Sequence, residues 1–134
     1  MPTRLSKATI LVVDDEVALR QLLVRQLRSE GYTVLEASYG MEALAVARAS
    51  DDQIHLVLSD IRMPGMLGTE LARRLVAEHP SVRVVLMSAH ALDDLTTISD
   101  ARGVVQVLAK PFDGQTMLAV VKLVLEFEPA PPSS

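Results

Sequence analysis

Short, mostly apolar runs alternate along this chain with longer segments in which apolar residues recur every three or four positions. The short runs have the length and composition of strands in a parallel sheet that is covered on both faces. They are Ala8 to Val13, Thr33 to Ala37, Ile54 to Leu58, Val82 to Met87 and Val104 to Ala109. The helical patterns that follow them are Val17 to Glu30, Met41 to Ala49, Leu67 to Glu78, Asp93 to Ala101 and Gln115 to about Phe127.

This alternation predicts an α/β fold with a five-stranded parallel sheet and helices on both faces. Right-handed crossovers of this length suit a doubly wound, flavodoxin-like sheet, for which we predict the strand order 2-1-3-4-5. The chain then reverses direction between its first and third strands. Such a reversal opens a crevice at the carboxyl ends of those two strands, which is where sheets of this kind bind ligands.

The 134 residues fit one domain. We expect residues 1–7 to form a loose leader, residues 8–128 the domain, and residues 129–134, which read PAPPSS, a disordered tail or the start of a linker. No kinase or DNA-binding module fits in the remaining residues. The chain is therefore expected to be a free-standing domain or one excised from a longer protein.

Composition excludes several functions. A net charge of −4 argues against direct nucleic-acid binding and gives no support for docking on anionic membranes. The absence of cysteine excludes disulfides and thiolate chemistry, and the scattered His55, His79 and His90 lack the spacing of a zinc site. No apolar run approaches the ~20 residues of a membrane span. We expect a cytoplasmic protein.

The ends of the predicted strands carry the polar chemistry. Asp14 and Asp15 follow the first strand, Asp60 the third, Ser88 the fourth and Lys110 the fifth. Crowded carboxylates raise one another's pKa unless a cation lies among them, and oxygen ligands suit Mg²⁺ or, in its place, Mn²⁺. The lysine and the hydroxyl suit anionic oxygens.

Together these groups favour phosphoryl transfer onto an acid, with Asp60 as the nucleophile. The product, an acyl phosphate, hydrolyses, so the domain would act as a transient switch. Each residue alone is typical of ordinary turn or cap chemistry. Their occurrence in this order, each at the end of a different strand, is what points to a site.

With these residues in view, the chain resembles the receiver domains of two-component response regulators, the CheY-like superfamily. The resemblance covers roughly Ala8 to Phe127 and rests on the stretches ILVVDDE, LVLSDIRMPG, VVLMSA and LAKPF. It implies a signalling switch that catalyses only its own phosphorylation and dephosphorylation. The implied partners are a histidine kinase or a histidine phosphotransfer protein, whose phosphohistidine supplies the phosphoryl group.

The resemblance also implies residue roles. Asp60 would be the phosphoacceptor and, with Asp15 and the backbone carbonyl of Arg62, a direct Mg²⁺ ligand, while Asp14 would act through water. Ser88 and Lys110 would bind phosphoryl oxygens. The family typically has a cis peptide bond between the lysine and the proline that follows it.

One departure from the family pattern concerns Val107. Members usually carry Tyr or Phe three residues before the lysine, and the ring changes rotamer with the hydroxyl residue after phosphorylation. A valine packs but cannot swing a ring, so this chain lacks the side chain that usually carries the signal from Ser88 to the face of the fourth strand and the last helix. Arg62 and His90 occupy positions that vary in the family and are linked to dephosphorylation rate.

Two other functions compete with the switch. A pseudo-receiver, which is an inert interaction module, is favoured by Val107 and opposed by the intact acidic set. A magnesium-dependent aspartyl-phosphate phosphatase usually has two acids separated by one residue after the first strand, whereas Asp14 and Asp15 are adjacent. The apolar last helix either contacts the core broadly or docks a second copy, a kinase or an output domain.

Overall fold

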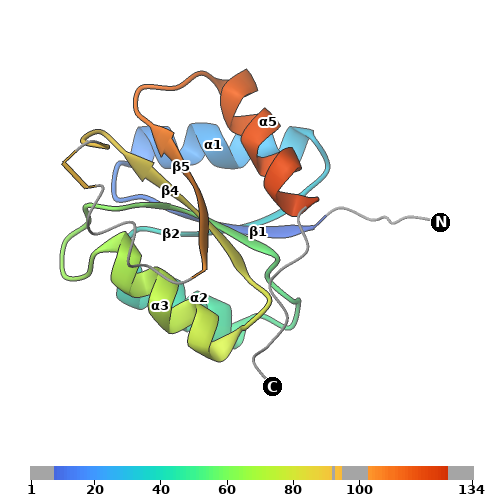
Figure 1. Ribbon diagram of the computed structural model, residues 1–134. Helices are drawn as coiled ribbons and strands as arrows, with labels where there is room; N and C mark the ends of the chain where they lie inside the picture. Colours follow the sequence, from blue (N-terminus) through green and yellow to red (C-terminus); the bar gives the residue numbers. More distant parts are fainter. Residues whose placement is uncertain (1–7, 92, 95–102, 127–134) are drawn as a thin grey trace.

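A five-stranded sheet forms the centre of the computed structural model, which describes residues 8–91, 93–94 and 103–126 (Figure 1). Its strands are β1 (Thr9–Val13), β2 (Thr33–Ala37), β3 (Leu56–Asp60), β4 (Arg83–Ser88) and β5 (Val104–Ala109). The order β2-β1-β3-β4-β5 confirms the prediction. Every neighbouring pair is parallel, so the carboxyl ends of all five strands lie at one edge.

Helices cover both faces of the sheet, as predicted for a doubly wound fold. They are α1 (Val17–Ser29), α2 (Gly40–Ala49), α3 (Gly68–Glu78) and α5 (Gly114–Leu125). In Figure 1, α1 and α5 lie on one side of the sheet and α2 and α3 on the other. The helix predicted over Asp93 to Ala101 lies, apart from its first two residues, outside the described residues.

The alternation of side chains along the strands builds two separate cores. In β1, Ile10 and Val12 point to the core beneath α1 and α5, whereas Leu11 and Val13 point to the core beneath α2 and α3. All four side chains are fully buried. A central strand without an exposed residue explains why the run is apolar at every position rather than at alternate ones.

The predicted limits of the third strand were wrong by two residues at each end. Ile54 is buried but precedes β3. At His55 the backbone N–H donates to the Thr9 carbonyl at 2.9 Å, while the Thr9 N–H donates to the side-chain Nδ1 of His55 at 3.0 Å rather than to a backbone carbonyl. Ladder pairing with β1 begins at Leu56. At the other end the strand continues through Asp60, since this segment still pairs with β4.

The last helix contacts the core broadly. Asp113 caps it as predicted, because its Oδ1 accepts the Thr116 N–H at 2.7 Å. Met117, Val121 and Val124 are buried against the sheet. Leu118, Val120 and Leu125 pack at the margin of the same core, while Leu123 is exposed. Most of the apolar surface of this helix is thus accounted for by the core.

Candidate functional site

Three carboxylates meet where β1 and β3 end. Val13 pairs with Ser59 across the two strands, so Asp14, just after β1, faces Asp60, the last residue of β3. Asp14, Asp15 and Asp60 each offer an oxygen within 4.8 Å of the others; we call them the acidic cluster. Asp14 is fully buried, Asp15 is exposed, and the Asp60 side chain is 15% exposed.

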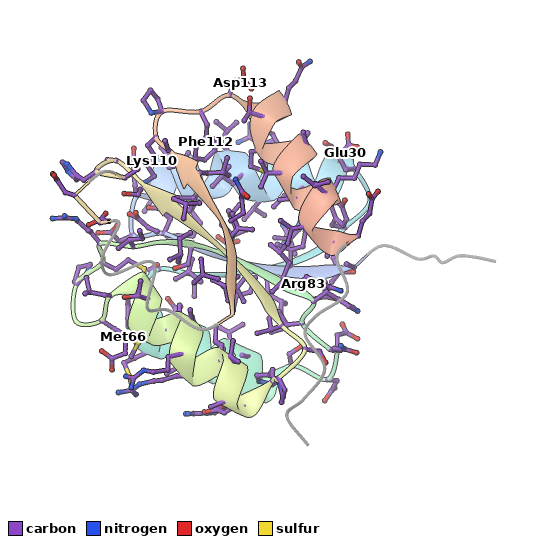
Figure 2. All side chains as sticks on the ribbon, in the orientation of Figure 1. Glu30, Met66, Arg83, Lys110, Phe112 and Asp113 are labelled. Atoms are coloured by element: carbon purple, nitrogen blue, oxygen red, sulfur yellow. The ribbon has the colours of Figure 1, made fainter. Side chains whose placement is uncertain are left out.

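Lys110 brings a positive charge to the acidic cluster from the end of β5 (Figure 2). Its Nζ lies 3.3 Å from Asp14 Oδ2 and 3.5 Å from Asp60 Oδ2. The backbone holds it there, because the Lys110 N–H donates to the Ser88 carbonyl at 2.8 Å. The Lys110–Pro111 peptide bond is cis, as the family resemblance implied.

Burial and the charges of the cluster shift the pKa values of Asp60 and Lys110. Burial, together with the charges of Asp14 and Asp15, raises the pKa of the Asp60 carboxyl, and Lys110 only partly opposes this. Burial tends to lower the pKa of Lys110, but Asp14 and Asp60 outweigh it and raise that pKa above its ordinary value. The lysine therefore stays protonated, while Asp60 takes up a proton more readily than an ordinary aspartate.

The donor set fits a divalent cation. Three carboxylates and one ammonium leave a surplus of two negative charges when all are ionised. The raised pKa of Asp60 indicates that Lys110 alone does not offset the burial and mutual repulsion of the acids. All-oxygen ligands with one exposed member suit Mg²⁺, or Mn²⁺ in its place, because these ions keep several waters.

Two residues that the sequence did not single out support the cluster. Arg20 of α1 donates through Nη1 to the Asp14 carbonyl at 2.9 Å, while its Nε pairs with Glu36 of β2 at 3.0 Å. Gly68 begins α3 against β3, where any Cβ would fall onto the Asp60 carbonyl oxygen. Nothing in the sequence distinguished Arg20 from the other polar residues of its helix. A glycine shortly after the Pro64-Gly65 turn was the available signal for the close approach.

Ser88 lies at the same edge, and its hydroxyl has a partner that the sequence did not reveal. Ser88 Oγ donates to Asp94 Oδ2 at 2.7 Å and accepts the His90 N–H at 3.0 Å. Asp94 Oδ1 in turn accepts from Arg62 Nη2 at 2.8 Å. We call Ser88, Asp94 and Arg62 the hydroxyl network. Burial tends to raise the pKa of Asp94, but the bonds from Arg62 and Ser88 lower it overall.

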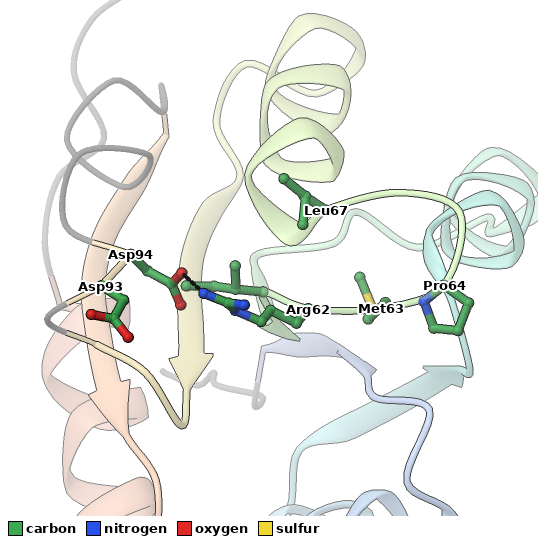
Figure 3. A pocket seen from close by; sticks show the side chains of 7 residues that line it. Arg62, Met63, Pro64, Leu67, Asp93 and Asp94 are labelled. Atoms are coloured by element: carbon green, nitrogen blue, oxygen red, sulfur yellow. Dashed lines mark hydrogen bonds and ion pairs between the residues drawn. The ribbon is translucent and has the colours of Figure 1, made fainter.

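A groove of about 530 Å³ lies beside the hydroxyl network (Figure 3). Its lining residues are Ile61, Arg62, Met63, Pro64, Leu67, Asp93 and Asp94. Within the described part of the chain, the acidic cluster does not line it. The groove therefore adjoins the cluster through the loop after Asp60 rather than containing it. Val107 lies apart, partly buried against the core under α2 and α3.

Comparisons with known proteins agree on one family. The model of the response regulator receiver domain matches residues 10–122. Sensor kinase CckA of Brucella abortus (strain 2308) is 39% identical over 119 residues, which are 89% of this chain and 13% of that kinase. Sporulation initiation phosphotransferase F of Bacillus subtilis (strain 168) is 34% identical over 113 residues, 84% of this chain and 90% of that protein.

A solved structure adds a ligand to the comparison. The response regulator TrrA from Thermotoga maritima, in complex with Mg²⁺ and BeF, superposes with a TM-score of 0.73 and 32% identity. The match covers 87% of this chain and 98% of that one. Separately, no helix among the described residues combines the length and apolar character needed to cross a membrane.

Proposed function

This chain belongs to the response regulator receiver domain family of two-component systems, and on that basis we propose that Asp60 accepts a phosphoryl group from a phosphohistidine. The observation that carries the proposal is the position of Lys110, whose ammonium lies within 3.5 Å of both Asp14 and Asp60. The donor would be a histidine kinase or a histidine phosphotransfer protein. The similarity to a sensor kinase and to a phosphotransferase supports such a partner.

The transfer is a displacement at phosphorus. An oxygen of the Asp60 carboxylate attacks, the new O–P bond forms, and the P–N bond to the donor imidazole breaks with its electron pair on nitrogen, which solvent protonates. Lys110 binds a phosphoryl oxygen as a point charge, and the Ser88 hydroxyl donates to another. Hydrolysis of the acyl phosphate restores Asp60, so the domain acts as a switch rather than as an enzyme on other substrates.

A divalent cation completes this scheme. Asp15, Asp60 and the backbone carbonyl of Arg62 would hold Mg²⁺ directly, with Asp14 through water. Bound there, the ion supplies charge neutralisation at the transferring phosphoryl group. The complex of TrrA with Mg²⁺ and BeF supports this choice of metal. Downstream, we infer a cytoplasmic partner, an output domain or a second copy at the face formed by β4 and α5.

Intact mass spectrometry tests the proposal. We expect incubation with acetyl phosphate and Mg²⁺ to add one phosphoryl mass to the wild type, and chelation of the metal to prevent it. Asp60→Asn should give no adduct, because the amide is not a nucleophile. Asp51→Asn, at an exposed aspartate, is the matched control and should label normally. A wild type that stays unlabelled while an established receiver labels would reject the proposal in favour of an inert interaction module.

A further inference from the structure

The hydroxyl network holds a buried acid to which the proposed reaction assigns no role. We propose that Asp94 is a positioning residue: it binds the Ser88 hydroxyl in the unphosphorylated protein and releases it when a phosphoryl group arrives on Asp60. Asp94 would thereby compete with the phosphoryl group for the Ser88 hydroxyl, and the loss of its bond to Ser88 would mark the phosphorylated state. This inference rests on the proposed function of Asp60, and it names Asp94 as the group that competes with the phosphoryl oxygen for the Ser88 hydroxyl.

The bond between Ser88 and Asp94 is of the strong kind. At 2.7 Å, an O–H donor to a carboxylate has the length of a charge-assisted hydrogen bond. Both residues are buried, with exposed fractions of 2% and 6%, so water competes little for either group. Breaking this bond therefore has a real free-energy cost unless another acceptor replaces Asp94.

The hydroxyl cannot serve both acceptors at once. A serine has one proton to donate, and in this structure it goes to Asp94 Oδ2. The oxygen of the same hydroxyl also accepts the His90 N–H at 3.0 Å, which fixes it from the other side. Donation to a phosphoryl oxygen on Asp60 thus requires the Ser88 proton to leave Asp94.

Arg62 keeps Asp94 in place before and after that exchange. Its Nη2 donates to the other carboxylate oxygen, Oδ1, at 2.8 Å (Figure 3). The two oxygens of Asp94 therefore have separate donors, Arg62 and Ser88. Arg62 belongs to the loop just after Asp60, which ties the acceptor of the hydroxyl to the strand of the phosphoacceptor. When Ser88 leaves, the charge of Asp94 stays paired with Arg62 and need not be solvated.

The neighbouring Asp93 supplies a matched control. It lines the same groove and carries the same charge, but it is exposed and Figure 3 shows its carboxylate without a bond to Arg62. Asp93 is therefore a control for the loss of a neighbouring negative charge in the same groove. A change at Asp94 but not at Asp93 indicates that the contacts of Asp94 with Ser88 and Arg62 matter, and the Ser88→Ala background below separates these two contacts.

Binding of a phosphoryl analogue tests the exchange. We expect beryllofluoride, titrated calorimetrically at saturating Mg²⁺, to bind Asp94→Ala about 10-fold more tightly than the wild type, since a hydrogen bond to a charged group is no longer lost. Asp93→Ala should bind within about 2-fold of the wild type. Asp94→Asn, which keeps the shape and a weaker neutral acceptor, should fall between wild type and alanine and covers the case in which Asp94→Ala does not fold.

The Ser88→Ala background separates this mechanism from a general effect of charge. There, Asp94→Ala should no longer tighten binding, because no hydroxyl remains to be released. Persistence of the gain in that background, or an equal gain in Asp93→Ala, would overturn the inference. So would unchanged or weaker binding to both Asp94 variants while the wild type binds. A wild type that binds no beryllofluoride would instead reject the proposed function and this inference with it.

A spectroscopic readout locates the hydroxyl directly. The amide proton of His90 donates to Ser88 Oγ, so its chemical shift reports the position of that oxygen. We expect Asp94→Ala and beryllofluoride each to shift the His90 resonance of the protein, and Asp93→Ala to leave it unchanged. A His90 resonance that is unaffected by both would contradict the exchange.

Discussion

The two sides of Asp60 are built on opposite electrostatic principles. On one side, the acidic cluster brings three carboxylates together around a single ammonium, and burial, together with the charges of Asp14 and Asp15, raises the pKa of Asp60. On the other, both oxygens of the Asp94 carboxylate accept hydrogen bonds, from Arg62 and Ser88, and although burial tends to raise its pKa, these bonds lower it. The acidic cluster has a surplus of negative charge that a cation can neutralise, whereas in the hydroxyl network the carboxylate of Asp94 already has two donors.

This difference predicts that the two sides contribute to ligand binding with opposite sign. A divalent cation on the acidic side relieves the repulsion among the three carboxylates, and the anionic phosphoryl group is attracted by the Lys110 ammonium. The hydroxyl side must first give up a short hydrogen bond before it contributes. Variants on the two sides should therefore differ in sign as well as in size.

The largest expected effect is that of Lys110→Met. Phosphoryl labelling by acetyl phosphate should slow about 100-fold, since a preorganised positive group facing the transferring oxygens is lost. Metal affinity should rise at the same time, because the cation 3.3 Å from Asp14 no longer repels Mg²⁺. Initial rates from intact mass and a Mg²⁺ titration measure the two effects.

Lys122→Met, at an exposed lysine of α5, is the control for this experiment and should change neither quantity. A parallel fall of labelling and metal affinity in Lys110→Met would contradict the division between the two sides. It would indicate instead that the lysine holds the acidic cluster together.

A smaller effect is expected from the metal on stability. Mg²⁺ at ten times its dissociation constant should raise the free energy of unfolding by about 1.4 kcal/mol. The gain should be the same in Asp94→Ala and much reduced in Asp60→Asn, because Asp60 is a proposed ligand of the ion, whereas Asp94 contacts the side chain of Arg62 and not its proposed ligand, the backbone carbonyl. Denaturant titrations with Mg²⁺, against a chelator at equal ionic strength, give the difference. Loss of the gain in Asp94→Ala would show that the two sides are not separate.

The smallest effect is the removal of the Asp60 charge in the absence of metal. Because folding raises the pKa of Asp60, its ionised form destabilises the folded protein above that pKa, and this penalty disappears below the pKa of the unfolded chain. Asp60→Asn should therefore be more stable than the wild type at neutral pH by up to about 1 kcal/mol. The difference should vanish on acidification.

Thermal unfolding of both proteins across pH, with a chelator present, measures this dependence. Asp51→Asn should follow the wild type at every pH, since its carboxylate is exposed. An Asp60→Asn variant that is less stable at neutral pH would mean that Lys110 more than compensates the burial and repulsion of Asp60.

The acidic side was predictable from the sequence because backbone topology alone assembles it. Apolar runs locate the buried strands, parallel pairing brings their carboxyl ends together, and Asp14, Asp60 and Lys110 stand at those ends. The limits of β3 were less well predicted. Apolarity reports burial, and Ile54 is buried although the ladder with β1 begins only at Leu56.

The hydroxyl side was not predictable from the sequence, because side-chain contacts rather than strand pairing assemble it. Ser88 stands at a strand end and was found, but its acceptor Asp94 lies in a turn six residues further along the chain, where strand pairing does not fix its position. In the sequence, Asp94 reads as an ordinary polar residue at the start of a helical pattern. Its pairing with Arg62 joins two loops that are 32 residues apart, and only side-chain geometry reveals it.

The complete burial of β1 has a consequence for the time scales of the molecule. All five of its residues are buried, and it is hydrogen-bonded to neighbours on both sides. Amides in such a strand exchange with deuterated solvent chiefly when the whole domain opens. The arrangement of Asp14 beside Asp60 should therefore persist until the whole domain unfolds, without local unfolding of β1. We therefore expect Asp14 to follow directly after a strand whose amides exchange slowly.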